Sequence, residues 1–279
     1  MIYNLTMRPH QLFKRVVALP QDHGSWVFLF SPLLIGLFAG QSFSTGSLAL
    51  TMAAISAFLL RQPVTIATKV YSGRRPQSDL PAAFFWIAIY VLILTLSLAV
   101  LFARGYIFIL YLAIPGLAVF SWHLLLVSRR KERGQVGVEI LATGVLALSA
   151  PAAYWISLGF YETEGWWLWI LTWLQSAASI VYTYLRLEQR TLLATPTRKE
   201  RFILGIRAFG YTSFNLCFSA ILSVMNTLPG LIFLPYLLQW IETLWGIMNP
   251  AIGQKPTRIG IRQLFVSSLF TLLFIITWR

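Results

Sequence analysis

The stretch PAAFFWIAIYVLILTLSLAVLFA, residues 81–103, decides the fold class, because it holds 23 residues and no charged side chain. A helix of about 20 apolar residues crosses the hydrocarbon core of a bilayer. Similar runs fill a chain that is 57% hydrophobic and 11% charged, with a mean hydropathy of +0.70. Soluble domains carry about 25% charged residues. The composition excludes a soluble enzyme, a disordered chain and a collagen-like fibre, and it predicts an all-α, polytopic membrane protein.

Nine apolar segments are long enough to be transmembrane helices of a single helical domain that covers residues 1–279. The first is the shortest, and Arg61, Pro63 and Lys69 interrupt the second. The predicted spans are 25–41, 47–71, 81–103, 106–128, 136–159, 165–185, 205–225, 228–248 and 261–278.

The basic residues support this division of the chain. The net charge is +13, from 22 Lys and Arg against 9 Asp and Glu. If the N-terminus lies inside, 19 basic residues fall on the inner side and only Arg104 and Arg279 fall on the outer side. Cytoplasmic loops of membrane proteins carry such an excess. We therefore expect an inner N-terminus, an outer C-terminus and no nucleic-acid partner, in a bacterial-type cytoplasmic or thylakoid membrane.

Ionisable groups near or inside the spans are candidate functional residues, because burying them in a bilayer is costly. Asp22 and His23 open the first span within Pro20-Gln-Asp-His-Gly-Ser-Trp26. Asp22 can cap the following helix, and His23 can carry a proton or donate to an anion. The alternative is a capped and closely packed helix start.

The second span places Arg61, Thr65 and Lys69 on one helical face, at spacings of four residues. Arg61 is too deep to face lipid, so it should have a partner. Glu242 in the eighth span has a similar depth. The sequence leaves open a buried Arg61–Glu242 pair and a positive pocket for an anion.

The inner end of the sixth span carries Tyr182, Arg186 and Arg190, again at four-residue spacing. These arginines are either solvated at the membrane interface or placed at the mouth of the same pocket, where arginine would bind phosphate or carboxylate. Glu139, about one turn inside the fifth span, is with His23 a candidate acid or base. Cys217 is the only cysteine, and no carboxylates have metal-binding spacing, so we expect no metal site.

The opening stretch resembles the signature of the YwiC-like family of integral membrane proteins. The matching residues are Pro20, His23, Gly24, Trp26, Pro32 and Gly36. Weaker matches are Pro63, Lys69, Arg133 and Glu139, and we expect the resemblance to cover most of the chain. The family implies a membrane protein but no assigned activity.

The topology also resembles, more distantly, the UbiA prenyltransferase superfamily, which implies a UbiA-like helical bundle. In those enzymes the loops after spans two and six carry Asp-rich motifs that hold magnesium and a prenyl diphosphate. Here Arg61, Thr65 and Lys69 stand in place of the first motif, and Arg186 and Arg190 in place of the second. Because Mg²⁺ needs oxygen ligands, we expect no magnesium and no other cofactor.

These observations lead to a main hypothesis and several alternatives. The main hypothesis is a protein that binds an anionic lipid, an isoprenoid among the candidates, or a small anion in a basic pocket that faces the cytoplasm. Asp22, His23, Arg61, Thr65, Lys69, Tyr182, Arg186, Arg190 and Glu242 would form that pocket. The alternatives are a UbiA-type lipid or prenyl transferase with altered motifs, a transporter, and an accessory subunit of a membrane-protein complex.

Overall fold

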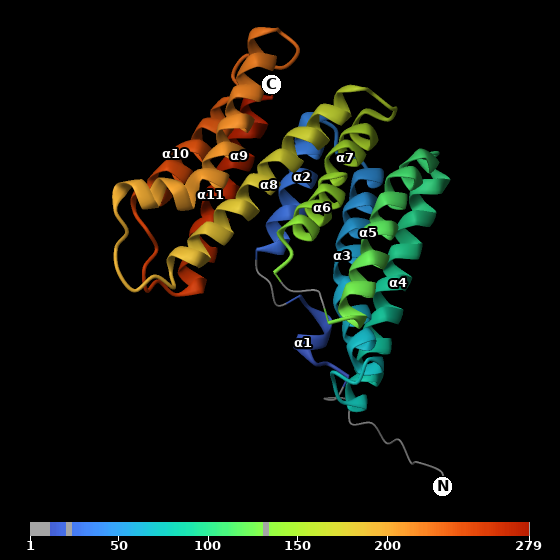
Figure 1. Cartoon of the computed structure of the whole chain (residues 1–279). Coiled ribbons are helices and arrows are strands. Elements are labelled where there is room, and N and C mark those ends of the chain that lie inside the picture. The colour runs from blue at the N-terminus through green and yellow to red at the C-terminus, as the bar shows by residue number, and fades with distance from the viewer. Residues whose placement is uncertain (1–11, 21–23, 131–133, 279) are drawn as a thin grey trace. The chain divides into compact units, whose positions relative to one another are not determined.

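The computed structural model describes residues 12–20, 24–130 and 134–278, and these residues contain helices and no strand (Figure 1). Asp22 and His23 lie outside the described residues. The described contacts group into two compact units, and the single helical domain over residues 1–279 stays a prediction. Unit 1 comprises residues 1–22 and 43–135, and unit 2 comprises residues 23–42 and 136–279.

Unit 1 is built from three long helices and shorter elements. Its helices are α1 (Arg15–Ala18), α3 (Thr45–Tyr71), η2 (Gln77–Asp79), α4 (Leu80–Ala103), η3 (Ile107–Ile109) and α5 (Leu110–Ser128). α3 packs along α4 and contacts α5. The short α1 segment is tied to α4 by hydrogen bonds from Trp86 Nε1 to the Leu12 carbonyl and from the Tyr90 hydroxyl to the Ala18 carbonyl, each 3.0 Å long. Val17, Ile66 and Ala83 lie in the core beneath it.

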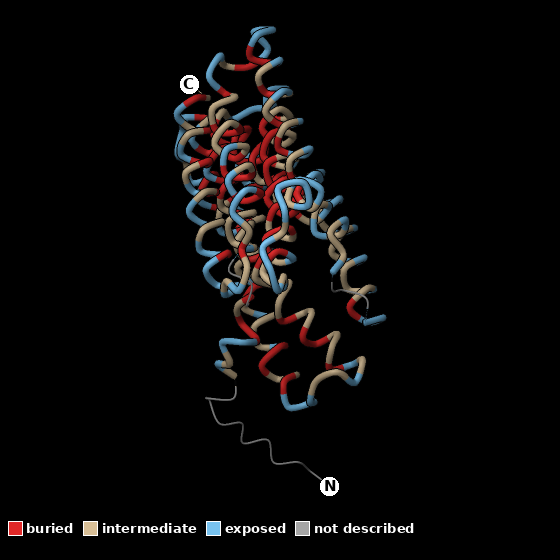
Figure 2. The backbone as a smooth tube through the Cα atoms, turned by 60° about the vertical axis from the view of Figure 1, so that its left-hand side comes forward, coloured by how far each residue is buried: buried red, intermediate tan, exposed pale blue. Residues whose placement is uncertain are grey.

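Unit 2 contains the remaining helices, arranged around α8. They are α2 (Ser25–Ala39), α6 (Val136–Ala147), α7 (Ser149–Leu158), α8 (Glu164–Gln189), α9 (Arg198–Val224), α10 (Leu234–Met248) and α11 (Pro256–Thr277). α8 contacts α2, α6, α7, α9, α10 and α11. Figure 2 shows long runs of buried residues along the helices of this unit. The central position of α8 explains why it carries buried polar residues.

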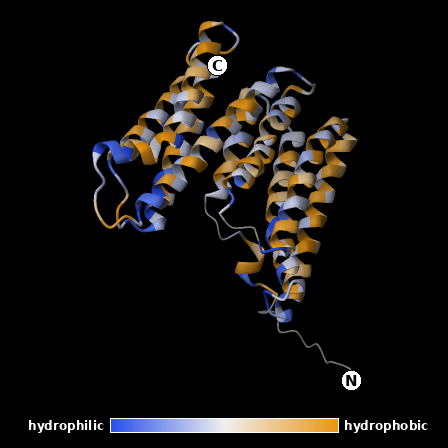
Figure 3. Ribbon diagram, in the orientation of Figure 1, coloured by the Kyte–Doolittle hydropathy of each residue, from blue (hydrophilic) through white to orange (hydrophobic). Residues whose placement is uncertain are grey.

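Each of the nine predicted spans coincides with a helix or, for 136–159, with two successive helices. Five helical stretches are long and apolar enough to cross a membrane: 45–71, 77–103, 107–128, 136–158 and 256–277. Figure 3 shows apolar residues along α4 and α5, and many of their large side chains are exposed, as helices in lipid require. The chain thus has the helices of a membrane protein. That all nine segments cross, and in which direction, stays a prediction.

Several predicted boundaries differ from the structure, and α11 begins at Pro256 instead of 261. The fifth span divides at Leu148 into α6 and α7, because Pro151 has no amide hydrogen to donate to the carbonyl four residues earlier. α9 begins at Arg198 instead of 205, because Thr197 and Glu200 form a capping box. α10 begins at Leu234 instead of 228, since residues 226–233 form turns.

Gly36 lets α2 approach α7 closely, because an added Cβ atom would overlap the carbonyl of Ala150. We predict that Gly36→Ala lowers the stability of the protein by about 1–3 kcal/mol through overpacking, measured as a lower midpoint of thermal unfolding in detergent. Gly210→Ala is the matched control, because that helical glycine is exposed and has no atom within 4 Å of the added Cβ. Equal midpoints for the two variants would contradict this packing.

Candidate functional site

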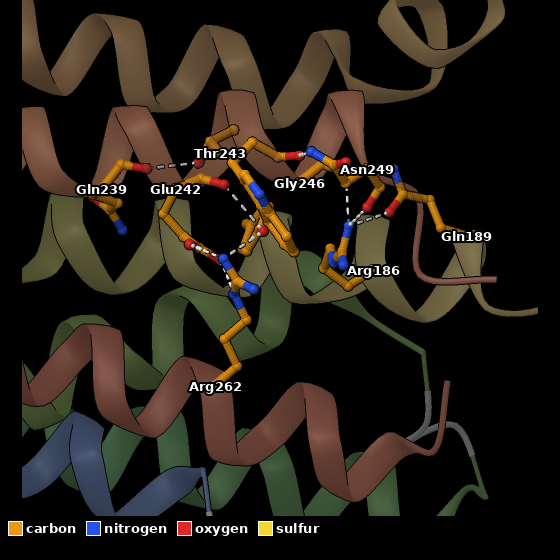
Figure 4. A network of polar contacts seen from close by, with 10 residues as sticks. Arg186, Gln189, Gln239, Glu242, Thr243, Gly246, Asn249 and Arg262 are labelled. Atoms are coloured by element: carbon orange, nitrogen blue, oxygen red, sulfur yellow. Dashed lines mark hydrogen bonds and ion pairs between the residues drawn. The ribbon is translucent and has the colours of Figure 1, made fainter. Parts of the chain in front are cut away.

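The most polar buried region that the structure describes lies in unit 2, between α8, α10 and α11 (Figure 4). Glu242 of α10 is 9% exposed. Its carboxylate accepts hydrogen bonds from Arg262 Nε at 2.6 Å, from Arg262 Nη2 at 2.7 Å and from the Tyr182 hydroxyl at 2.9 Å. A buried carboxylate needs such donors, because leaving it without them would cost several kcal/mol. Glu242 therefore connects three helices.

A glycine allows Tyr182 to reach this carboxylate. A Cβ atom at Gly246 would overlap the Tyr182 hydroxyl and ring, so α8 and α10 can approach this closely only with glycine at that position. The same hydroxyl lies 3.2 Å from the backbone carbonyl of Glu242. Small residues permit close helix contacts of this kind in membrane proteins.

Arg262 of the same unit pairs with Glu242, whereas the Arg61–Glu242 pair that the sequence left open would join the two units and stays untested. The two nitrogens of Arg262 bind the two carboxylate oxygens, the geometry that makes arginine–carboxylate pairs strong. The guanidinium of Arg262 also lies 3.4 Å from the centre of the Trp245 ring, in a cation–π contact. Arg61 lies in α3 of unit 1, with its guanidinium 5.3 Å from the Phe58 ring centre.

Arg186 is 2% exposed, which does not fit solvation at the membrane interface, one of the two alternatives that the sequence left open. Its Nη1 lies 2.7 Å from the carbonyl oxygens of Gly246 and Asn249 and 2.8 Å from Gln189 Oε1. The last carbonyls of a helix have no partner within the helix and carry partial negative charge. Arg186 thus caps the end of α10, and Nη1 is occupied by protein acceptors.

Gln189 completes this cap and anchors the segment after α10. Its amide nitrogen lies 3.2 Å from the Gly246 carbonyl, and its oxygen accepts from the Ala251 amide at 3.3 Å. The backbone carbonyl of Arg190 accepts from the Gly253 amide at 3.2 Å. The side chain of Arg190 is half-buried and makes no hydrogen bond with a described residue.

The predicted pocket residues are divided between the two units. Arg61, Thr65 and Lys69 are half-buried in α3 of unit 1. Tyr182, Arg186, Arg190 and Glu242 belong to unit 2, where Tyr182 and Glu242 meet directly. Glu139 of α6 is exposed and accepts a hydrogen bond of 2.7 Å from Tyr184. That all these residues form one pocket stays a prediction.

A second polar layer lies beside Glu242 and was missed by the sequence analysis. Gln239 donates to the Gln175 carbonyl at 3.0 Å and to Ser179 Oγ at 3.1 Å. Gln239 Oε1 is buried and has no hydrogen-bond partner among the described residues. It borders a cavity of about 10 Å³, which is the room one water needs.

Two signals in the sequence pointed to the residues that were missed. Gln239 and Glu242 are three residues apart, and Gln175, Ser179 and Tyr182 have spacings of four and three, so each set shares a helix face. Arg262 was counted only as an inner-loop charge, although the predicted span 261–278 contains it. Groups of three or more His, Cys, Asp or Glu side chains suited to a metal ion do not occur among the described residues.

Replacing Arg186 by methionine should leave the carbonyls of Gly246 and Asn249 without a donor. We predict a loss of stability of about 3 kcal/mol, measured by reversible unfolding in mixed detergent micelles. Arg190→Met is the matched control and should change stability by no more than about 0.5 kcal/mol. A similar loss for both variants would contradict the capping role of Arg186.

The pairing of Glu242 with Arg262 predicts coupling between the two side chains. In a double-mutant cycle, Glu242→Gln and Arg262→Gln should show a coupling energy of about 1–2 kcal/mol. This range is modest because the Arg262 side chain is 40% exposed. Arg258→Gln, which removes an exposed charge from the first turn of α11, should be additive with Glu242→Gln within about 0.5 kcal/mol. If the stability effects of Arg262→Gln and Glu242→Gln were simply additive, the pairing would be refuted.

A comparison with protein families gave a match over part of the chain. The family model described as YwiC-like protein matches residues 19–154, a shorter range than the sequence analysis expected. A search of curated proteins gave no match. A search of solved structures gave no match either, so the UbiA-like bundle stays a prediction. The Glu242 network lies beyond the matched residues. The chain therefore carries a YwiC-like segment over residues 19–154, and the family resemblance expected from its sequence is confirmed there.

Proposed function

We propose that this protein binds an anionic membrane lipid, one with a phosphate or carboxylate head group, at the basic end of unit 1. The observation that carries the proposal is the charge of this unit. Residues 1–22 and 43–135 contain twelve basic and three acidic residues, so most of the protein's net charge of +13 lies there. Basic clusters next to membrane helices attract anionic lipids.

The acidic residue that the structure describes in unit 1 already has two basic partners. Asp79 is 7% exposed and is the only acidic residue among the described residues of this unit. Its two carboxylate oxygens accept from Lys14 Nζ at 2.8 Å and from Arg75 Nη1 at 3.0 Å. Asp79 therefore holds the start of α4 against the segment before α1, and its charge is balanced locally.

The other basic residues gather at the same end of the unit. Lys69 lies in the last turn of α3, and Arg74 follows that helix. Arg74 donates from Nη1 to the Val127 carbonyl at 2.8 Å, which brings the end of α5, with exposed Arg129 and Arg130, to this region. At the opposite end of α4, the turn to η3 contains one basic residue, Arg104.

The neighbouring helices supply the apolar surface that a lipid tail requires. α4 and α5 are apolar along their full length and expose large side chains, among them Leu92, Leu96, Leu117 and Leu125. An amphiphile can lie along this surface with its head group at the basic end. Arg61 and Lys69 extend the positive charge of α3 from the end of the helix toward its apolar middle. Thr65 lies between them on the same face.

The proposal assigns the anion to unit 1 because the excess of basic over acidic residues is larger there than in unit 2. Arg186 binds carbonyl oxygens and Arg262 binds Glu242. The transferase, the transporter and the accessory subunit remain alternatives, and each would need an activity or a partner beyond lipid binding.

The test is native mass spectrometry of the full chain in detergent with phosphatidylglycerol or phosphatidylcholine of matched acyl chains. We predict that Arg61→Gln/Lys69→Gln weakens phosphatidylglycerol binding about 30-fold, because each charge contributes about 1 kcal/mol near an anionic head group. Phosphatidylcholine binding should not change.

Arg198→Gln/Lys199→Gln is the matched control, because it removes the same charge from exposed positions at the start of α9 in unit 2. This variant should retain phosphatidylglycerol. If both double variants lose the lipid equally, attraction by net charge alone explains the binding and the proposed site is wrong. Equal binding of the two lipids by wild type would also refute it.

A further inference from the structure

Unit 2 contains a cavity that the proposed function does not use. It has a volume of about 150 Å³ and opens between α2, α6, α8 and α11, which is an order of magnitude more room than one water needs. Val27, Phe28, Ile180 and Leu264 supply apolar walls. The polar side chains that border it are Glu139, Ser179, Thr183, Tyr184, Gln263 and Ser267.

One of these polar residues is buried, and its hydroxyl has no partner among the described residues. Ser267 is 5% exposed, and its hydroxyl makes no hydrogen bond with any described residue. The side-chain amide of Gln263, half-buried on the same helix, also makes none with the described residues. Buried hydroxyls are normally hydrogen-bonded, so a group that enters the cavity would complete the bonding of Ser267.

The cavity adjoins the water-sized space beside Glu242, because Ser179 and Gln263 border both. That smaller space contains Gln239 Oε1, a buried acceptor without a donor among the described residues. Thr183 cannot supply the donor, since its hydroxyl donates to the Ser179 carbonyl at 2.8 Å. An acceptor that lacks a donor among the described residues therefore lies close to the cavity.

The charged group that borders the cavity also favours a donor over an anion. Glu139 borders it, with one carboxylate oxygen held by Tyr184 at 2.7 Å, and no basic residue is among the described residues that border it. A carboxylate or phosphate entering here would meet the like charge of Glu139, which is unfavourable. A hydroxyl or a primary ammonium would instead find acceptors.

We propose that this cavity binds an amphiphile whose head group donates hydrogen bonds and carries no negative charge, namely an aliphatic alcohol or primary amine. The head group lies near Glu139 and Ser267, and the first part of the chain lies against Val27, Phe28 and Leu264. This site is independent of the anionic-lipid site of unit 1, and each can fail without the other.

The test is photolabelling of the full chain in detergent with an aliphatic diazirine that has a terminal amine, followed by peptide mapping. We expect labels on the peptides of α2, α8 and α11 that border the cavity. Octylamine and octanol should compete with the label, whereas octanoate should not. Labels elsewhere, or equal competition by octanoate, would overturn the proposal.

Two neighbouring serines supply a matched pair of variants. Ser267→Leu fills the cavity and should lower labelling at least about tenfold. Ser268→Leu makes the same substitution at the adjacent, exposed position of α11 and should leave labelling unchanged. Equal labelling of the two variants would overturn the site.

Glu139→Gln keeps the proposal testable if Ser267→Leu does not fold, because the Glu139 side chain is exposed. This variant should reduce competition by octylamine about tenfold relative to octanol, since only the amine gains from the carboxylate charge. An unchanged ratio would remove Glu139 from the site and contradict the proposed head-group chemistry.

Discussion

The structure of unit 2 depends on one constraint, namely that a carboxylate buried between helices must be surrounded by donors. Glu242 meets this requirement through Tyr182 of α8 and Arg262 of α11. Each donor depends on a further residue, since Gly246 makes room for Tyr182 and Trp245 supports the guanidinium of Arg262. The network therefore sets the positions of three helices and holds Arg262 in an ion pair inside unit 2.

Long apolar runs could be predicted from the sequence because their length and hydropathy are local properties. All nine predicted segments are helical, although α9 and α10 begin at different residues than expected. The start of α9 was predictable, because Thr197 and Glu200 have the spacing of a capping box. The division of the fifth span into two helices was also predictable, because Pro151 lacks an amide hydrogen. The grouping of helices into two units depends on contacts between distant segments, which periodicity does not report.

The candidate site was predicted less completely, and for a physical reason. Depth along a helix suggested that Glu242 and a deep arginine form a pair, and the acid was the right choice. Arg262 was not considered as the partner, because depth fixes one coordinate along a helix and leaves the neighbouring helices undetermined. Similarly, the position of Arg186 near a helix end suggested solvent, whereas the end of α10 covers it.

The central claim is that the basic residues have two different roles. Those of unit 1 attract an anionic head group, while Arg186 and Arg262 stabilise unit 2. An experimental structure of the full chain in phosphatidylglycerol nanodiscs tests it most directly. The account predicts a lipid phosphate within hydrogen-bond distance of Arg61 or Lys69, with Glu242 still held by Arg262 and Tyr182. A phosphate bound by Arg186 or Arg262, with Glu242 released, would contradict it.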